Sequence, residues 1–147
     1  MADMQDLIEK HLKTVMTKII GINQMIVSSK KSGDVIAAAS KFARKENIEN
    51  VAALSSTLYQ LSQASEKPLD SSIFEFATGE KLFTIMGDDV ILSAVSDASV
   101  QMGISRMYLK KFADGIDKAY KKAQVSIKEE YRDHELASIF RSISESQ

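Results

Sequence analysis

The spacing of apolar residues switches along this chain between a helical period and short continuous runs, and this alternation constrains the fold most. Apolar residues recur every three or four positions in Asp3–Ile20, in Glu46–Ala64 and from Ser99 to Tyr120. Such spacing gathers them on one face of an amphipathic helix. Gly21 follows the first segment directly, where it suits the residue after a helix end. The sequence therefore predicts three long helices.

Five shorter apolar runs, separated by turn-forming residues, predict β-strands. Two of them flank a loop that contains Gly33, which is typical of a hairpin, although Ala37–Ala39 would also suit a helix. The other three are separated by Thr78–Glu80 and Gly87–Asp89, which is typical of a meander. The predicted strands are Ile22–Ser28, Val35–Ser40, Ser71–Ala77, Leu82–Met86 and Val90–Val95.

The order of these elements, α-ββ-α-βββ-α, predicts the architecture. Val35–Ala39 and Val90–Val95 are almost continuously apolar, which is typical of strands covered on both faces. We therefore expect an α+β fold, a three-layer α/β/α sandwich with one five-stranded antiparallel sheet. The 147 residues suit one domain, which we place at residues 1–123. Residues 124–147 are predicted to form a C-terminal helical extension, with Leu136, Ile139, Phe140 and Ile143 on one face.

The strand Ser71–Ala77 is expected at the edge of the sheet, because it begins the meander. It carries Ile73, Phe74 and Phe76, and it contains neither lysine nor proline. An apolar edge strand without such protection tends to pair with another chain. In a two-fold homodimer, this strand would pair with the same strand of the second copy, so its edge would no longer be open. The alternative is that the second helix or the C-terminal helix covers the edge.

The residues that usually carry catalysis or bind metals and cofactors are absent or scattered. There is no cysteine, which excludes disulfides, thiolate metal sites and cysteine nucleophiles. No glycine-rich phosphate loop occurs, and His11 and His134 lie far apart without a ligand pattern. The pair Asp88-Asp89 is better explained as a hairpin turn than as a metal site. We predict that the protein is not an enzyme, has no catalytic residues and needs no metal or cofactor.

Charge and hydropathy limit the partners that we expect. A net charge of −1 gives no argument for binding nucleic acid, and the lysines at positions 111, 118 and 122 suit a solvated helix face. No apolar run is long enough to cross a membrane, and the acidic N-terminal residues are not typical of a signal peptide. We therefore expect a cytoplasmic protein that neither inserts into membranes nor binds nucleic acid.

Several glycine-containing apolar patterns resemble those of the roadblock/LC7 family, also called the dynein light chain roadblock family. The predicted hairpin resembles the family's opening strands in Gly21–Val27 and Gly33–Ala38. Val51–Ser55 resembles its second helix, and Glu80–Leu92 resembles its meander. Val100–Gly103, followed by a long helix, resembles its junction into the last helix. The resemblance covers about residues 5–120, and the C-terminal extension lies beyond it.

This resemblance implies a specific dimer. Roadblock domains pair through their third strand and second helix, which joins two sheets into one continuous sheet. The strand is the one that the edge argument selects independently, and small residues in the helix would let two helices approach closely. The implied interface residues are Val51, Ala52, Ser55, Ser56, Tyr59, Ile73, Phe74 and Phe76.

The resemblance also implies the kind of partner. Family members bind Ras-like small GTPases as scaffolds or regulators, or attach as light chains to motors, and are not enzymes themselves. A GTPase-activating protein often supplies an arginine finger, but neither Arg44 nor Arg106 stands out as one. We therefore expect a homodimer that binds a small GTPase. The alternatives are a light-chain adaptor without nucleotide linkage and, ranked last, a small-molecule sensor.

Overall fold

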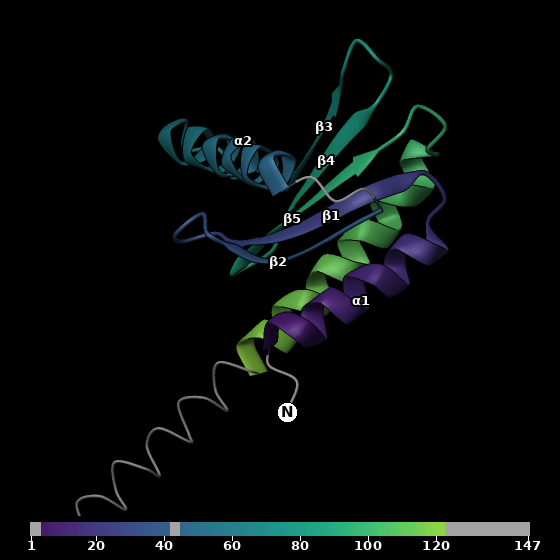
Figure 1. Cartoon of the computed structure of the whole chain (residues 1–147). Helices are drawn as coiled ribbons and strands as arrows, with labels where there is room; N and C mark the ends of the chain where they lie inside the picture. Colours follow the sequence, from purple (N-terminus) through teal and green to yellow (C-terminus); the bar gives the residue numbers. More distant parts are fainter. Residues whose placement is uncertain (1–3, 42–44, 123–147) are drawn as a thin grey trace, which may run out of the picture.

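A computed structural model describes residues 4–41 and 45–122 and contains one five-stranded antiparallel sheet (Figure 1). The strands lie in the order β2-β1-β5-β4-β3. The labelled elements are α1 (Met4–Lys18), β1 (Ile22–Ser29), β2 (Val35–Ser40), α2 (Lys45–Ala64), β3 (Ser71–Glu75), β4 (Lys81–Met86) and β5 (Val90–Ser96). A further helix covers residues 102–122. The predicted extension at residues 124–147 lies outside the described residues.

Helices cover both faces of the sheet. α1 and the 102–122 helix lie side by side on one face, and α2 lies on the other (Figure 1). This arrangement confirms the predicted three-layer α/β/α sandwich of α+β type. It also confirms the meander, because β3 pairs with β4 and β4 pairs with β5. β3 forms one edge of the sheet, as the sequence predicted.

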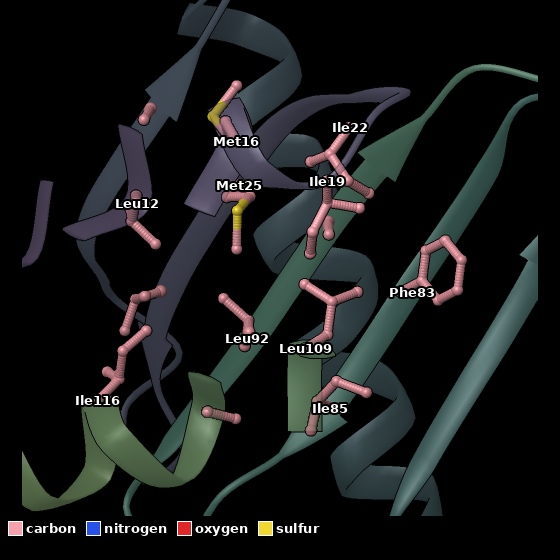
Figure 2. Close-up of a cluster of buried hydrophobic side chains, with 14 of the residues drawn as sticks. Leu12, Met16, Ile19, Ile22, Met25, Phe83, Ile85, Leu92, Leu109 and Ile116 are labelled. Atoms are coloured by element: carbon pink, nitrogen blue, oxygen red, sulfur yellow. The ribbon is translucent and has the colours of Figure 1, made fainter. Parts of the chain in front are cut away.

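The main hydrophobic core lies between the sheet and the layer of α1 and the 102–122 helix (Figure 2). The antiparallel register aligns side chains in rows across three strands, because residues that face each other point to the same side. One row on this face is Val27–Leu92–Ile85, and the next is Met25–Ala94–Phe83. Both rows are at most 4% exposed. α1 adds Ile8, Leu12 and Met16, and the 102–122 helix adds Leu109, Ala113 and Ile116.

Val35–Ala39, one of the two apolar runs that predicted helices on both faces of the sheet, lies in β2. β2 forms the second edge of the sheet and alternates between more and less buried positions. Ala37 and Ala39 join the core, whereas Val35 is 39% exposed. The small alanine side chains allow α1 to pack closely over this strand. The other apolar run lies in β5, most of which is buried.

Candidate interaction surface

α2 contacts the sheet most closely through two small side chains. Among residues 47–64 of this helix, only Ala52 and Ser55 are buried, at 2% and 0% exposed. The Ser55 hydroxyl lies 2.7 Å from the Ser93 hydroxyl of β5 and 3.4 Å from that of Thr84 in β4. All three hydroxyl-bearing residues are fully buried, so each hydroxyl needs a partner within the protein. The interface between α2 and the sheet is therefore narrow and polar at its centre.

Part of the apolar stripe of α2 is open to solvent. Leu54 and Leu61, two of its members, are 39% and 61% exposed. Ser56 and Tyr59, on the other side of the helix, face the loop between β1 and β2. The Lys30 ammonium lies 5.0 Å from the centre of the Tyr59 ring, and a side chain at Gly33 would be 3.0 Å from the Ser56 hydroxyl. Leu54 and Leu61 therefore lie on the side of α2 that is nearer to the other edge of the sheet, which β3 forms.

β3 adds apolar side chains and an open backbone edge to this surface. Phe74 is opposite Leu82 and shares the α2 face of the sheet, whereas Ile73 is opposite Phe83 and shares the core face. Ile73 is 38% exposed, and Phe76, just after the strand, is 45% exposed. The Phe76 amide donates to the Glu80 carbonyl in the direction of β4. Because amide direction alternates along a strand, Ile73 and Glu75 direct theirs to the open side.

The structure divides the predicted interface residues into two groups. Ala52 and Ser55 are buried against the chain's own sheet, so their side chains are out of reach of a second protein. Their small size serves the approach of α2 to that sheet, not the approach of two helices. The others, Val51, Ser56, Tyr59, Ile73, Phe74 and Phe76, are partly or largely exposed. The predicted interface does not include Leu54 and Leu61, which belong to the apolar stripe that predicted α2 and are exposed.

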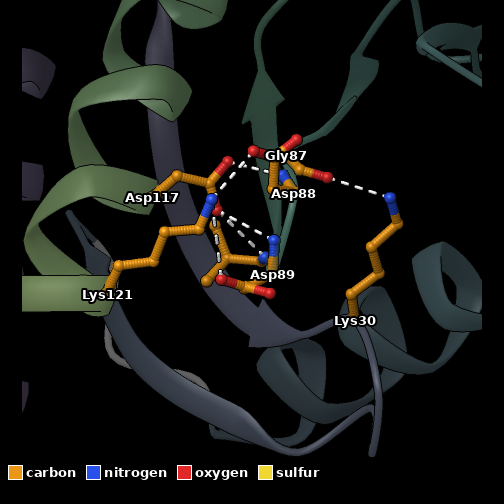
Figure 3. A network of polar contacts seen from close by, with 7 residues as sticks. Lys30, Gly87, Asp88, Asp89, Asp117 and Lys121 are labelled. Atoms are coloured by element: carbon orange, nitrogen blue, oxygen red, sulfur yellow. Dashed lines mark hydrogen bonds and ion pairs between the residues drawn. The ribbon is translucent and has the colours of Figure 1, made fainter. Parts of the chain in front are cut away.

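A buried carboxylate organises the turn between β4 and β5 (Figure 3). Asp117, from the 102–122 helix, is 6% exposed and accepts hydrogen bonds from three backbone amides. The donors are Asp88 at 2.6 Å, Asp89 at 3.1 Å and Val90 at 3.2 Å. Lys30 approaches the same turn and donates to the Gly87 carbonyl at 2.9 Å. Asp88-Asp89 thus forms a turn, as expected, that is fixed to the last helix.

Lys121 closes this network at the surface. Its ammonium lies 2.9 Å from the Asp88 carboxylate, and this hydrogen bond, together with the charge, holds the pKa of Asp88 below its usual value. The same bond raises the pKa of Lys121. The pair therefore stabilises the fold at pH values above the ordinary pKa of aspartate and loses this effect as the pH falls through the lowered one. Both side chains are exposed, so the contribution is small.

The other side chains that were considered for catalysis or metal binding do not form a site among the described residues. Arg106 donates to the Ser71 hydroxyl, and Lys110 pairs with Asp70, so both tie the last helix to the start of β3. Arg44 and His134 lie outside the described residues, and His11 is exposed on α1. Within residues 4–41 and 45–122, no three His, Cys, Asp or Glu side chains are grouped to hold a metal. No helix in this part of the chain is long and apolar enough to cross a membrane.

Comparisons with known proteins agree on the fold. No family model and no curated protein matches the sequence. Among solved structures, MglB in a tetrameric arrangement is 14% identical, with a TM-score of 0.72 over 84% of this chain and 94% of that one. The gliding protein MglB of Thermus thermophilus is 13% identical, with a TM-score of 0.65 over 83% and 94%. A roadblock/LC7 domain from Streptomyces avermitilis is 13% identical, with a TM-score of 0.56 over 78% and 92%. The chain therefore has the roadblock/LC7 fold.

Proposed function

We propose that this protein is a dimeric, non-catalytic module that binds a Ras-like small GTPase and scaffolds or regulates it. The observation that carries the proposal is the combined surface of α2 and β3 on a roadblock/LC7 fold. This surface presents Leu54, Leu61 and Phe76 to solvent beside the outer edge of β3, which pairs with no other strand among the described residues. The GTPase partner is inferred from the family resemblance of the sequence.

A two-fold axis beside β3 would complete both features of the surface. Antiparallel pairing of β3 with its copy would satisfy the outward amides of Ile73 and Glu75. It would also bring the partner's α2 onto the same face of the joined sheets. The leucine stripe of each α2 and the Phe74 side chains would then face one another across the axis. The residues that we assign to the dimer are Val51, Leu54, Leu61, Ile73, Phe74 and Phe76. Ser56 and Tyr59 are left out of the assigned interface, because they face the loop between β1 and β2.

Substituting Phe76→Lys is expected to convert the dimer into a monomer, because it places a charge inside the assigned interface. We expect the dimer dissociation constant to rise by about 100-fold or more, which corresponds to roughly 3 kcal/mol. Sedimentation equilibrium over a concentration series measures it. Val35→Lys is the matched control, since Val35 is an exposed apolar residue on the opposite edge strand. A second variant, Glu75→Pro, removes an outward amide while leaving the pairing with β4 in place. A dimer unchanged by both variants would refute this interface.

Binding of a GTPase is tested by affinity capture from native lysate, with GDP and with a non-hydrolysable GTP analogue in parallel. We expect a Ras-like GTPase to be retained preferentially in one nucleotide state. The Phe76→Lys variant, run beside the unmodified protein, reports whether binding needs the dimer. Retention of a motor or scaffold component regardless of nucleotide would instead favour the light-chain adaptor.

A further inference from the structure

The layer formed by α1 and the 102–122 helix carries two hollows, both lined by residues of the two helices, on the face of the sheet opposite α2 (Figure 1). The two helices lie side by side (Figure 1). At one end a hollow of about 270 Å³ is lined by Ile20, Ile104 and Tyr108 among others. At the other end a hollow of about 240 Å³ is lined by residues including Ile8, Phe112 and Gly115. We call this surface, from one hollow to the other, the two-helix groove.

The apolar side chains at one end of the two-helix groove are largely exposed to solvent. Ile20 is 87% exposed, and Ile104 and Tyr108 are 55% and 57% exposed. The last two belong to the apolar stripe that predicted this helix. Farther along the same stripe, Ile116 joins the core and Phe112 packs against it. Contiguous exposed apolar surface beside hollows is typical of a site where another segment binds.

Gly115 gives a second, independent indication that another segment binds in the two-helix groove. It lies in the interior of the 102–122 helix, where glycine is among the poorest helix formers. A Cβ atom at this position would meet no atom within 4 Å, so the described fold does not require glycine here. The contrast is Gly87, where a Cβ atom would overlap the Asp117 carboxylate. A glycine in the wall of a groove allows a passing backbone to approach closely.

The charges lining the two hollows define the occupant further. Lys18 and Lys111 line them together with His11, and neither lining includes an aspartate or glutamate. Among the described residues, neither lysine forms an ion pair with a carboxylate. The complementary occupant is an amphipathic segment with one apolar face and acidic flanks.

We propose that residues 133–147 of this same chain occupy the two-helix groove. This segment carries Leu136, Ile139, Phe140 and Ile143 at helical spacing, with Asp133, Glu135 and Glu145 against a single arginine. As a helix its 15 residues would span about 22 Å, which matches the rise from Ile104 to Ala119 along the groove. The ten residues 123–132 exceed the usual length of a connection between antiparallel helices, so the segment can return to the groove.

Crosslinking in the full-length chain tests this assignment directly. The protein has no cysteine, so His11→Cys, in the hollow that also contains Gly115, and Ala137→Cys in the segment create a unique pair. A short bismaleimide is expected to join them within one chain, giving a product with the mass of a single protomer. A crosslinked product with twice that mass would assign the groove to a second copy. No crosslinked product would leave it to another protein. Either result overturns the proposal.

Two matched variants test whether the crosslink depends on docking in the two-helix groove. Gly115→Glu adds bulk and a repelling charge to the wall, and it is expected to lower the crosslinking yield about tenfold. Gly103→Glu makes the same change in the first turn of the same helix, also in open space but outside both linings. It is expected to leave the yield unchanged. Circular dichroism checks that both variants are folded. Equal yields from the two variants would contradict docking in the groove.

Discussion

Substituting Asp117→Ala is expected to lower the free energy of unfolding by about 2–4 kcal/mol, because it removes one acceptor from three amides. The Val90 amide is buried and would be left without its partner, whereas the amides of Asp88 and Asp89 can turn to water at the surface. For a chain of this size the loss corresponds to a fall in melting temperature of roughly 5–15 °C. Thermal and urea unfolding followed by circular dichroism measure both quantities.

Asp114→Ala is the matched control, since Asp114 lies on the same helix and is exposed. Its effect is expected to stay within about 0.5 kcal/mol. Gly87→Ala tests the same contact from the other partner, because its new methyl group would displace the Asp117 carboxylate from the turn. The two variants, Gly87→Ala and Asp117→Ala, should therefore destabilise the protein to a similar degree. If Asp117→Ala behaves like Asp114→Ala, the carboxylate does not fix the turn.

Local sequence patterns predict the helices and strands of this fold, but they do not predict the contact between Asp117 and the turn. The elements themselves depend on local patterns, such as the helical spacing of Ile8, Leu12 and Met16, and these were predicted correctly. The role of Asp117 could not be predicted in this way. The amides that Asp117 binds lie nearly 30 positions away in the chain. A carboxylate in a helix is also normally expected on its solvated face. Only the packing of the helix against the sheet brings them together.

The candidate interface illustrates a second limit. The apolar stripe of α2 predicted a helix correctly, but the period alone does not say which face meets the sheet. Normally the larger side chains would be buried, yet the sheet accepts Ala52 and Ser55 and leaves Leu54 and Leu61 exposed. The signal that could have revealed this is on β4 and β5. Thr84 and Ser93 make the centre of the opposing face polar, which favours a small polar residue over leucine.

Substituting Ser55→Leu is expected to destabilise the protein by about 3–5 kcal/mol, because two costs add at one buried position. The Ser93 oxygen lies 2.7 Å from that of Ser55, so there is no room for three further carbon atoms unless α2 moves away from the sheet. Replacing the hydroxyl also leaves that of Ser93 without this hydrogen-bond partner. Urea unfolding measures the stability, with Thr57→Leu on the exposed side of α2 as the control.

The effect of Ser55→Leu should extend beyond stability to the dimer. Ser55 and Ala52 set the height of α2 above the sheet, and that height sets where Leu54 and Leu61 lie relative to β3. If α2 is lifted, the leucine stripe and the β3 edge no longer form one continuous surface. We therefore expect the folded fraction of Ser55→Leu to dimerise more weakly in sedimentation equilibrium, although its side chain never contacts the partner. Unchanged dimerisation in a destabilised variant would show that β3 alone determines the pairing.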